Sequence, residues 1–452
     1  MKFKNFYSII AIFLLLITYS WQNIKTKKYS NPLSVIAHDV KSYYGYLPAT
    51  FIDKDITLKF LYDINMKKWN YWPETAPNGG LVIKTSMGMS IMYSPFFFIA
   101  HYLVKNTKYK ANGFSTPYAF ALIVSSVFYV IIGFIFLRLL LLKYFKDIIV
   151  TISILILGLA TNLYCYTTFY APMSHGYSFS LFCIFLFLIE KWQEKQKIIT
   201  TVFLGLIIGM ITLIRPTNGL IVIVFLLFNV AYFNDILARL KFYLKNYHKI
   251  ILMIFVAFIV WIPQFIYWKY ITGDWFFYSY GKNEQFFFNE PKIFSVLLGF
   301  RKGWLIYTPV MLFALTGIGM LWKYNRQYFY PVLIFTVVNI YVVSSWWCWW
   351  YGGGFGMRPL IESYAILAIP LATFLAWMIK QKKLLRIPLI VVVTAISLQS
   401  IFHTIQYYGK AIHYDSMTFK AYIDSFWQTE PSSDFYSLLF DPDYEDARNG
   451  KR

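Results

Sequence analysis

The chain has 452 residues, of which 58% are hydrophobic, 21% are aromatic and only 14% are charged. Soluble domains usually carry about 25% charged residues, so this composition excludes an ordinary soluble enzyme and a disordered chain. Apolar runs of roughly 20 residues, long enough to cross a bilayer, recur along the whole sequence. The chain is therefore predicted to be an all-α polytopic membrane protein.

The 42 Lys and Arg residues outnumber the 21 Asp and Glu residues, which gives a net charge of +21. In a soluble protein this excess would suggest a nucleic-acid partner. In a membrane protein, basic residues in short loops more simply anchor the cytoplasmic ends of helices, so no nucleic acid is expected. The three cysteines, Cys165, Cys183 and Cys348, are scattered and odd in number, which indicates neither a disulfide framework nor a zinc site.

The first apolar run, 6–20, follows Lys2 and Lys4. No small-residue cleavage site comes after it, so an uncleaved first helix is predicted. The next stretch, 22–80, is too polar to span. Further apolar runs lie at 86–104, 117–142, 148–166, 174–190, 198–214, 217–234, 250–271, 304–322, 330–345, 359–379 and 387–406. They lack the alternation of a membrane β-barrel, so the spans are expected to be helical.

The basic loops decide the predicted orientation. If 86–104 does not span, the loop clusters all fall on the same side as Lys2 and Lys4, which the positive-inside rule places in the cytoplasm. These clusters lie within 138–146, 191–197, 239–249, 323–326 and 380–386. The prediction is therefore about 11 spans in a domain of residues 1–406, with a cytoplasmic amino terminus. A first outer loop, 22–116, would contain a juxtamembrane helix near 86–104, and a short tail, 407–452, would lie outside.

This orientation gathers the unusual polar segments on the outer face, away from ATP and nucleotide sugars. Asp39 comes soon after the first helix and precedes Tyr43 and Tyr44. A carboxylate near the membrane surface can take a proton from an acceptor hydroxyl as a general base. The alternative is an ordinary solvated loop acid, and spacing alone leaves both open.

Three further polar residues of the outer face have two interpretations each. Lys84 lies before a Thr-Ser-Met-Gly helix start and suits a phosphate, or it caps the helix and snorkels. His175 is a positioning residue or a structural one. Arg215 lies beside the membrane on the non-cytoplasmic side, which indicates function, or it simply reaches the interface.

The most distinctive segment is the Trp-rich and Gly-rich run 345–359, which includes Trp346, Trp350 and Arg358 and is followed by Glu362. Tryptophans suit an aromatic belt at the membrane interface, whereas the glycines beside them let a backbone approach a ligand. Arg358 has the fork of donors that grips a phosphate. Arg301 lies in a second block, 299–304, of the same outer face.

The order of these features resembles the GT-C superfamily of integral-membrane glycosyltransferases that use polyprenyl-phosphate sugars. That superfamily includes protein O-mannosyltransferases, the lipid A aminoarabinose transferase and bacterial family 39-like enzymes. The resemblance covers about residues 1–410. It is carried by Asp39 with Tyr43 and Tyr44, by Lys84 with Gly88 and Pro95, and by 213–218, 300–309 and 346–358. The sequence departs from the family pattern in having Ser174-His175 where many members have a second acid.

The resemblance implies transfer of a sugar from a polyprenyl-phosphate donor to a lipid, polysaccharide or protein acceptor, on the outer face of a bacterial cytoplasmic membrane. It makes Asp39 the general base, while Lys84, Arg301 and Arg358 would stabilise the leaving phosphate. The residues expected to bind substrate are His38, Tyr43, Tyr44, Lys84, His175, Arg215, Arg301, Trp346, Trp350, Arg358 and Glu362. No cofactor is required by the sequence, and no ligand spacing supports a divalent metal.

Two other classes of protein remain as alternatives. A transporter or flippase of lipid-linked glycans would share the basic inner loops and the aromatic outer rim, but it would be expected to carry charges in mid-membrane or internal repeats. A polymerase of such glycans would be expected to have its large outer loop late in the chain, whereas the largest outer segment here comes first.

Overall fold

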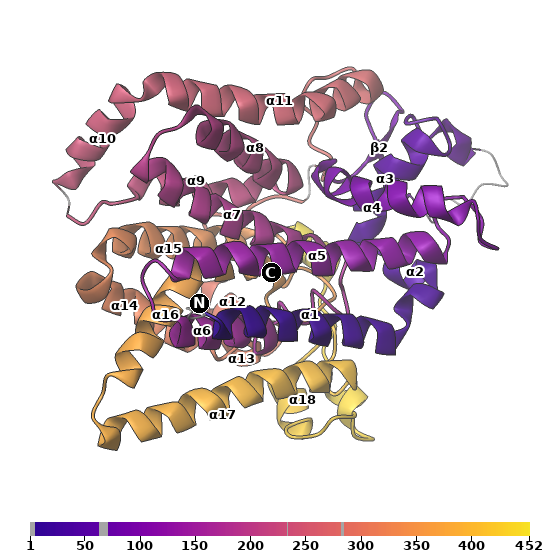
Figure 1. Ribbon diagram of the computed structural model, residues 1–452. Helices are drawn as coiled ribbons and strands as arrows, with labels where there is room; N and C mark the ends of the chain where they lie inside the picture. The colour runs from indigo at the N-terminus through magenta and orange to yellow at the C-terminus, as the bar shows by residue number, and fades with distance from the viewer. Residues whose placement is uncertain (1–4, 63–70, 233, 282–283) are drawn as a thin grey trace.

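The computed structural model describes residues 5–62, 71–232, 234–281 and 284–452, so Lys2 and Lys4 of the predicted cytoplasmic end lie outside it. The described chain is mostly helical (Figure 1). Its first half contains α1 (Tyr7–Thr26), α2 (Pro32–Val35), α3 (Asp39–Phe51), β1 (Pro73–Thr75), β2 (Leu81–Ile83), α4 (Gly88–Val104), α5 (Thr116–Leu141), α6 (Asp147–Leu159), α7 (Ser174–Glu194) and α8 (Ile198–Ile214).

The second half begins with the 3-10 helix η4 (Pro216–Ile221) and α9 (Val222–Leu227). It continues with α10 (Asp235–Lys245), α11 (Tyr247–Thr272), α12 (Ile293–Leu298), α13 (Trp304–Tyr307), α14 (Met311–Tyr324), α15 (Phe329–Ser345), η6 (Arg358–Leu360), α16 (Tyr364–Ile379), α17 (Lys383–Tyr408), α18 (Phe419–Asp424) and α19 (Tyr444–Arg448). Short 3-10 turns complete the chain at η1 (Lys28–Ser30), η2 (Lys59–Tyr62), η5 (Arg326–Tyr328) and η7 (Phe435–Leu438).

Five helical stretches are long and apolar enough to cross a bilayer, so the chain is a multi-pass membrane protein. They are α1, α5, α11, Arg326–Ser345 with α15, and α17. The apolar helices α4, α6, α8, α16 and the stretch Pro216–Leu227 have only 10–17 residues, and a span needs about 20. The predicted count of about 11 spans is therefore not confirmed.

Helix α6 shows why some predicted runs give shorter helices. The predicted run 148–166 forms a helix only as far as Leu159. Just beyond, the Thr161 hydroxyl donates to the Leu157 carbonyl at 2.6 Å and Asn162 Oδ1 accepts from the Tyr364 hydroxyl at 2.6 Å. Beyond α6 the chain forms turns over 160–173, and the contact with Tyr364 fixes Asn162 there.

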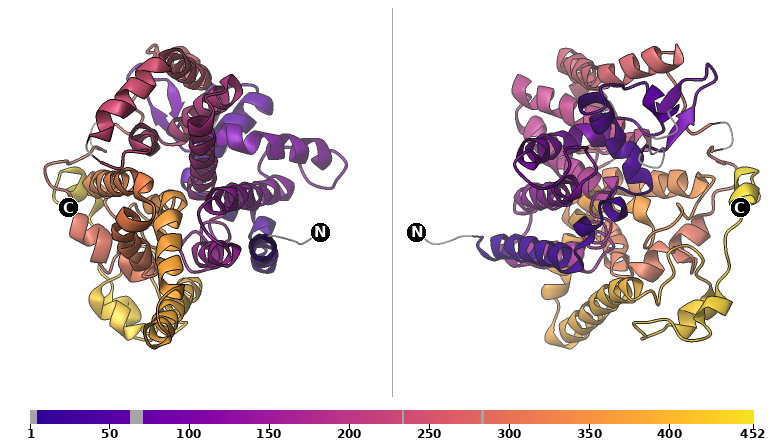
Figure 2. Two further views of the ribbon diagram at one scale, coloured as in Figure 1. Left: turned by 60° about the vertical axis from the view of Figure 1, so that its left-hand side comes forward. Right: turned by 90° about the vertical axis from the view of Figure 1, so that its right-hand side faces the viewer.

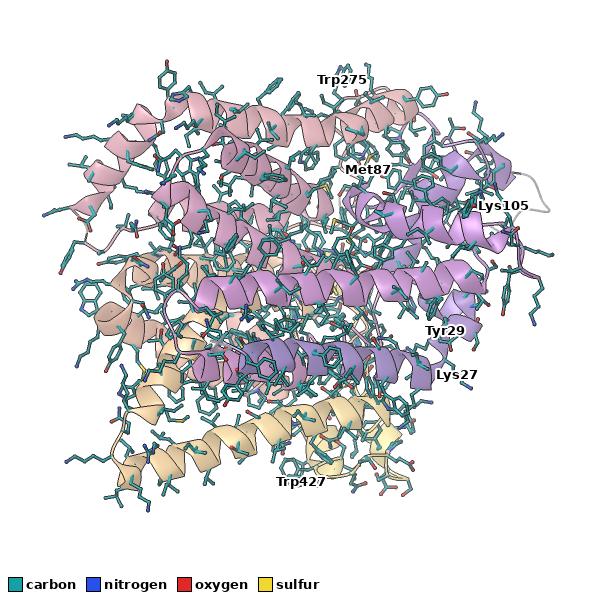
Figure 3. The ribbon with its side chains drawn as sticks, viewed as in Figure 1. Lys27, Tyr29, Met87, Lys105, Trp275 and Trp427 are labelled. Atoms are coloured by element: carbon teal, nitrogen blue, oxygen red, sulfur yellow. The ribbon has the colours of Figure 1, made fainter. Side chains whose placement is uncertain are left out.

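The loops sort to the two ends of the helices. The connections after α5, around α10, between α14 and α15 and between α16 and α17 lie at one end, on the left of Figure 1. The opposite end of the bundle holds α2, α18, the β-hairpin and the carboxyl terminus of α1. Lys27 and Tyr29 mark this second end in Figure 3, as do Lys105 and Trp275. The basic loops and the unusual polar segments are thus separated, as the orientation argument requires, while the side that each end faces stays a prediction.

The core and the lipid-facing surface follow from hydropathy. Helix α16 is buried on nearly all sides, because a helix that is apolar all round belongs inside a bundle. Helices α11 and α17 lie at opposite edges of the molecule (Figure 2), and many of their apolar side chains are exposed, as at Ile254 and Val391. Such exposed apolar faces fit contact with hydrocarbon.

The predicted first outer loop contains a structure that was not expected, the antiparallel hairpin of β1 and β2. Glu74 pairs with Val82 in its register, and Ala76 N donates to Gly80 O at 2.8 Å to close the turn. The loop therefore combines α2, α3, the hairpin and α4. Helix α4 corresponds to the juxtamembrane helix predicted near 86–104. Its position relative to the membrane stays a prediction.

Helices α14 and α16 pack so closely that a glycine in α14 is required. A Cβ at Gly317 would lie 2.0 Å from the carbonyl oxygen of Pro370, whereas a Cβ at Gly319 would meet nothing within 4 Å. Gly317→Ala is expected to destabilise the protein by about 2 kcal/mol, because overpacking forces the helices apart. The melting temperature of purified protein, followed by tryptophan fluorescence, measures this, and Gly319→Ala is the matched control. Equal melting temperatures for the two variants would contradict the packing.

Candidate active site

Asp39 is the first residue of α3, at the point where the outer loop turns into that helix. His38 has a φ of 48° and a ψ of −131°, which is uncommon for a residue with a side chain, and this turn starts the helix at Asp39. A carboxylate in the first turn is favoured by the partial positive charge of a helix amino terminus. The side chain of Asp39 is 31% exposed, so it remains open to a ligand.

Arg358 reaches Asp39 from the far end of the Gly-rich segment. Its Nη2 lies 3.3 Å from Asp39 Oδ2. Its Nε is buried and has no hydrogen-bond partner among the residues described. Burial lowers the pKa of Arg358, but the neighbouring Asp39 carboxylate and Tyr166 outweigh it and the net pKa is raised. Arg358 is thus a permanent cation with one donor engaged by Asp39 and another unused.

The glycines before Arg358 give the backbone the path that places this cation. Gly352, Gly354 and Gly356 have φ values of 65°, 154° and 58°, a region that favours glycine. A Cβ at Gly354 would lie 2.5 Å from the Tyr166 hydroxyl oxygen. The same hydroxyl accepts a hydrogen bond from Phe355 N at 3.2 Å. Close approach of the backbone to Tyr166 therefore requires a glycine at 354, while positive φ values favour glycine at 352 and 356.

A second charged group lies buried near the pair. His175 Nδ1 is 3.0 Å from Glu362 Oε1, and Arg215 Nη1 is 3.8 Å from the same oxygen. His175 and Glu362 are 0% and 2% exposed. The hydroxyl of Tyr43, on α3, lies beside Arg215 and within 3.3 Å of Ser174 Oγ. These contacts join α3, the start of α7 and the residues just before α16 to the end of α8.

A cavity of about 730 Å³ opens beside Asp39 and Arg358. Its walls come from five parts of the chain: the predicted first outer loop, α5, the turns at 160–173, the Gly-rich segment and the carboxyl-terminal tail. Among the predicted site residues, His38, Asp39 and Arg358 line this cavity. It combines carboxylate, guanidinium and aromatic groups, which suits a polar ligand with an apolar or ring-shaped part.

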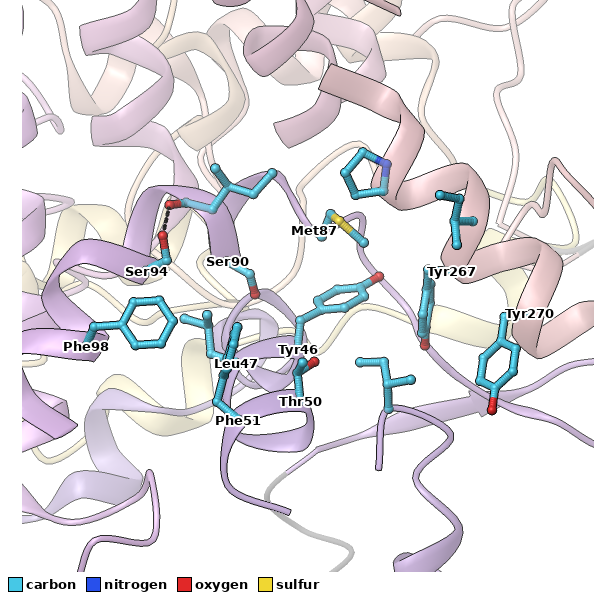
Figure 4. Close-up of a pocket in the computed structure, with 14 residues that line it drawn as sticks. Tyr46, Leu47, Thr50, Phe51, Met87, Ser90, Ser94, Phe98, Tyr267 and Tyr270 are labelled. Carbon is cyan, nitrogen blue, oxygen red and sulfur yellow. Dashed lines mark hydrogen bonds between the residues drawn. The ribbon is translucent and has the colours of Figure 1, made fainter. Parts of the chain in front are cut away.

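A second, apolar cavity of about 500 Å³ lies between α3, α4 and α11 (Figure 4). Tyr46, Leu47 and Phe51 of α3 form one wall, and Tyr267 of α11 forms another. Helix α3 thus contributes Asp39 to the polar cavity at its start and apolar side chains to this one at its end. With a rise of 1.5 Å per residue, Asp39 and Leu47 are about 12 Å apart along the helix.

Several predicted residues have other partners. Lys84 Nζ is 3.1 Å from Glu284 Oε1 and 3.3 Å from Glu74 Oε1, so two carboxylates neutralise it. Tyr44 is buried, and its hydroxyl donates to the Gly113 carbonyl at 2.6 Å.

The remaining predicted residues lie around the tail and the aromatic rim. Arg301 Nη1 donates to the Asp415 carbonyl at 2.9 Å, and Arg301 lies 5.8 Å from the ring of Trp350. Trp346 packs against Phe286, with ring centroids 4.7 Å apart. Arg301, Trp346 and Trp350 therefore lie next to the site, but they do not line the polar cavity.

Sequence reasoning missed the tail as a part of the site. The buried Lys302 Nζ donates to the carbonyls of Gly354 and Tyr414 and so ties the tail to the Gly-rich segment. Tyr414, Asp415 and Tyr444 line the polar cavity. The Tyr and Asp content of 414–446 and the basic pair Arg301-Lys302 were visible signals of this contact. Within the described ranges, no three His, Cys, Asp or Glu side chains group closely enough to hold a metal ion.

Lys302 gives a testable pH dependence. Burial lowers its pKa to about 7, from about 10.4 in an unfolded chain. Between these pH values the unfolded state binds more protons, so stability rises with pH, by at most about 1.4 kcal/mol per pH unit. The melting temperature of the wild-type chain is expected to rise between pH 7 and pH 9 relative to that of Lys302→Met. Parallel pH profiles for the two proteins would contradict the assignment.

Comparison with known proteins gave no matching family model and no matching curated protein. Solved structures of the oligosaccharyltransferase AglB from the archaeon Archaeoglobus fulgidus do match. The complex with an inhibitory peptide and a dolichol-phosphate superposes with a TM-score of 0.48 at 12% identity, over 97% of this chain and 58% of that one. The form tethered to an acceptor peptide gives 0.49 at 13% identity, over 96% and 57%. The apo form gives 0.48 at 13% identity, over 95% of this chain and 60% of that one. This chain therefore spans about three fifths of the length of the structures it resembles.

Proposed function

We propose that the chain is an integral-membrane glycosyltransferase of the GT-C type, which moves a sugar from a polyprenyl-phosphate donor to an envelope acceptor. The observation that carries the proposal is the Asp39–Arg358 pair, which is 3.3 Å apart at the wall of a 730 Å³ cavity. Transfer of a sugar from a lipid phosphate needs a base for the acceptor and a cation for the leaving group. The pair supplies both at one place.

Asp39 acts as the general base. Its carboxylate takes the proton of the acceptor hydroxyl as that oxygen attacks the anomeric carbon. The bond between the anomeric carbon and the phosphate oxygen breaks at the same time, with inversion of configuration. The polyprenyl phosphate leaves with the bonding electron pair, and Asp39 passes its proton to solvent after the acceptor product departs.

Arg358 stabilises the leaving phosphate. Negative charge develops on the phosphate in the transition state, and a cation already held in place lowers the barrier. Arg358 suits this role better than Lys84, because Lys84 already lies within 3.3 Å of two carboxylates. Arg358 has one carboxylate neighbour within ion-pair distance in the described chain and keeps an unpaired Nε.

The apolar cavity between α3, α4 and α11 supports a lipid-linked donor. It lies along the same helix as Asp39, and aromatic and aliphatic side chains line it. An isoprenoid chain gains about 0.8 kcal/mol for each buried CH₂. In this arrangement the lipid tail occupies the apolar cavity while the phosphate and sugar reach the polar one. We place the site on the outer face of a bacterial cytoplasmic membrane, with the amino terminus inside and the tail outside.

Asp39→Asn is expected to abolish transfer while leaving membrane insertion intact, because asparagine keeps the shape of the side chain and cannot take the proton. Mass spectrometry of envelope glycans and lipid-linked sugars would compare a deletion strain carrying either the wild-type or the Asp39→Asn chain at equal membrane abundance. One sugar should disappear from a glycan, and its polyprenyl-phosphate donor should accumulate.

The matched control is Glu430→Gln, which changes an exposed acid of the tail and should leave the glycan profile as in the wild type. If Asp39→Asn restores the full wild-type profile, Asp39 is not the base. Accumulation of an intact glycolipid on the cytoplasmic side instead would favour the flippase.

A further inference from the structure

The carboxyl-terminal tail is fixed onto the outer face at three points. At its start, Gly354 N donates to the Tyr414 carbonyl at 2.9 Å. In its middle, Arg301 donates to the carbonyls of Asp415 at 2.9 Å and Phe440 at 3.0 Å. At its end, Arg452 Nη1 donates to the Trp346 carbonyl at 2.9 Å. Each contact joins the tail to the Trp-rich and Gly-rich segment or to the Arg301 block. The tail is therefore an integral part of the structure around the site.

This attachment brings a second carboxylate to the polar cavity. Asp415 lines the cavity together with Asp39 and Arg358. The hydroxyl of Tyr444 donates to Asp415 Oδ2 at 2.8 Å. Asp415 is 8% exposed, and its Oδ1 is buried without a hydrogen-bond partner in the described part of the chain. A buried acceptor left unpaired is costly, so this oxygen is matched to a donor that arrives with a ligand.

The surroundings of Asp415 indicate the chemistry of that ligand. The aromatic residues Tyr166, Tyr414 and Tyr444 line the cavity with it. Carboxylate oxygens that accept hydrogen bonds, beside aromatic faces, suit a ring that carries hydroxyl groups. In the proposed function, Asp39 binds the acceptor hydroxyl and Arg358 binds the leaving phosphate. Asp415 is therefore the cavity carboxylate that remains to bind the transferred sugar.

We propose that Asp415, held by Tyr444, is a specificity-determining residue that accepts a hydrogen bond from one hydroxyl of the transferred sugar. This inference rests on the proposed function and deepens it, because it makes the tail the element that selects the sugar. A site built to bind a hydroxyl strongly rejects the analogue that lacks it, since the buried acceptor is then left unpaired.

The test measures kcat/KM of the purified full-length chain in lipid nanodiscs. The probes are farnesyl-phosphate glucose, galactose, mannose and N-acetylglucosamine, and the monodeoxy analogues of whichever sugar is transferred, with the acceptor identified from the glycan profile. The wild-type chain should discriminate against one deoxy analogue by about tenfold or more. Asp415→Asn should lose most of the activity toward the parent sugar and use the parent and that analogue within about twofold of each other.

Asp441→Asn is the matched control, because Asp441 is also a tail carboxylate and accepts a hydrogen bond from Ser416, but it is absent from the lining of the cavity. It should keep the wild-type discrimination. Tyr444→Phe should raise KM with little change in kcat and weaken the discrimination, since Asp415 loses its holding partner. Melting temperatures of all variants separate these effects from unfolding.

Two results would overturn the inference. If Asp415→Asn keeps the wild-type preference for the parent sugar, Asp415 only anchors the tail, while the proposed function stands. The second result has two parts: the wild-type chain transfers none of the sugars, and cells with the wild-type or the Asp39→Asn chain have the same glycan profile. In that case the proposed function and the inference are both wrong.

Discussion

The ion pair between Asp39 and Arg358 is the contact on which the rest of the site depends. It joins the first outer loop to a segment more than 300 positions later in the chain, and it brings a carboxylate and a guanidinium to one cavity wall. Partly buried charges are stable only when they are paired and hydrogen-bonded. Separating them would leave the Arg358 side chain, 15% exposed, without a carboxylate within ion-pair distance in the described chain, so the pair fixes the start of α3 against the Gly-rich segment.

The buried group of His175, Arg215 and Glu362 holds the same segments in place. Glu362 lies four residues after Arg358 and contacts His175 at 3.0 Å, so the segment that positions the guanidinium is also fixed to α7. Arg215 completes the group from the end of α8. Removing Glu362 would leave both His175 Nδ1 and the Arg215 guanidinium without this partner, and an unsatisfied buried polar group is costly. The Gly-rich segment is thus fixed by side-chain contacts to α7 and α8, while the tail is held mainly by hydrogen bonds to backbone carbonyls.

Much of this arrangement could be predicted from the sequence, for reasons that differ from residue to residue. Asp39 could be singled out because an acid lies just after the first helix, and Arg358 because glycines precede it. Composition and hydropathy gave a helical membrane protein, which the structure confirms, and helices occupy most of the predicted apolar runs. The turns after α6 could not be foreseen, because the partner of Asn162 there is Tyr364, 202 residues away in the chain.

The tail was the largest gap in the sequence-based account. Asp415 lies in a short polar segment with no periodic pattern, and the contacts of Lys302 and Arg301 with the backbone of 414–415 place it at the cavity wall. Lys84 shows the converse, since its position before a helix suggested a phosphate site, but Glu284, 200 residues away, already pairs with it. Long-range pairing of charges is decided by the fold, which local spacing does not reveal.

The most direct measurement of the central claim is the release of free polyprenyl phosphate by the purified chain in nanodiscs. The substrates would be the lipid extract of cells that carry Asp39→Asn and the acceptor identified from the glycan profile, and both products would be followed by mass spectrometry. The account predicts release by the wild-type chain and none by Asp39→Asn. Equal release by both proteins would contradict the role of Asp39. If the wild-type chain releases none but moves the intact lipid across a liposome bilayer, transfer is contradicted and transport takes its place.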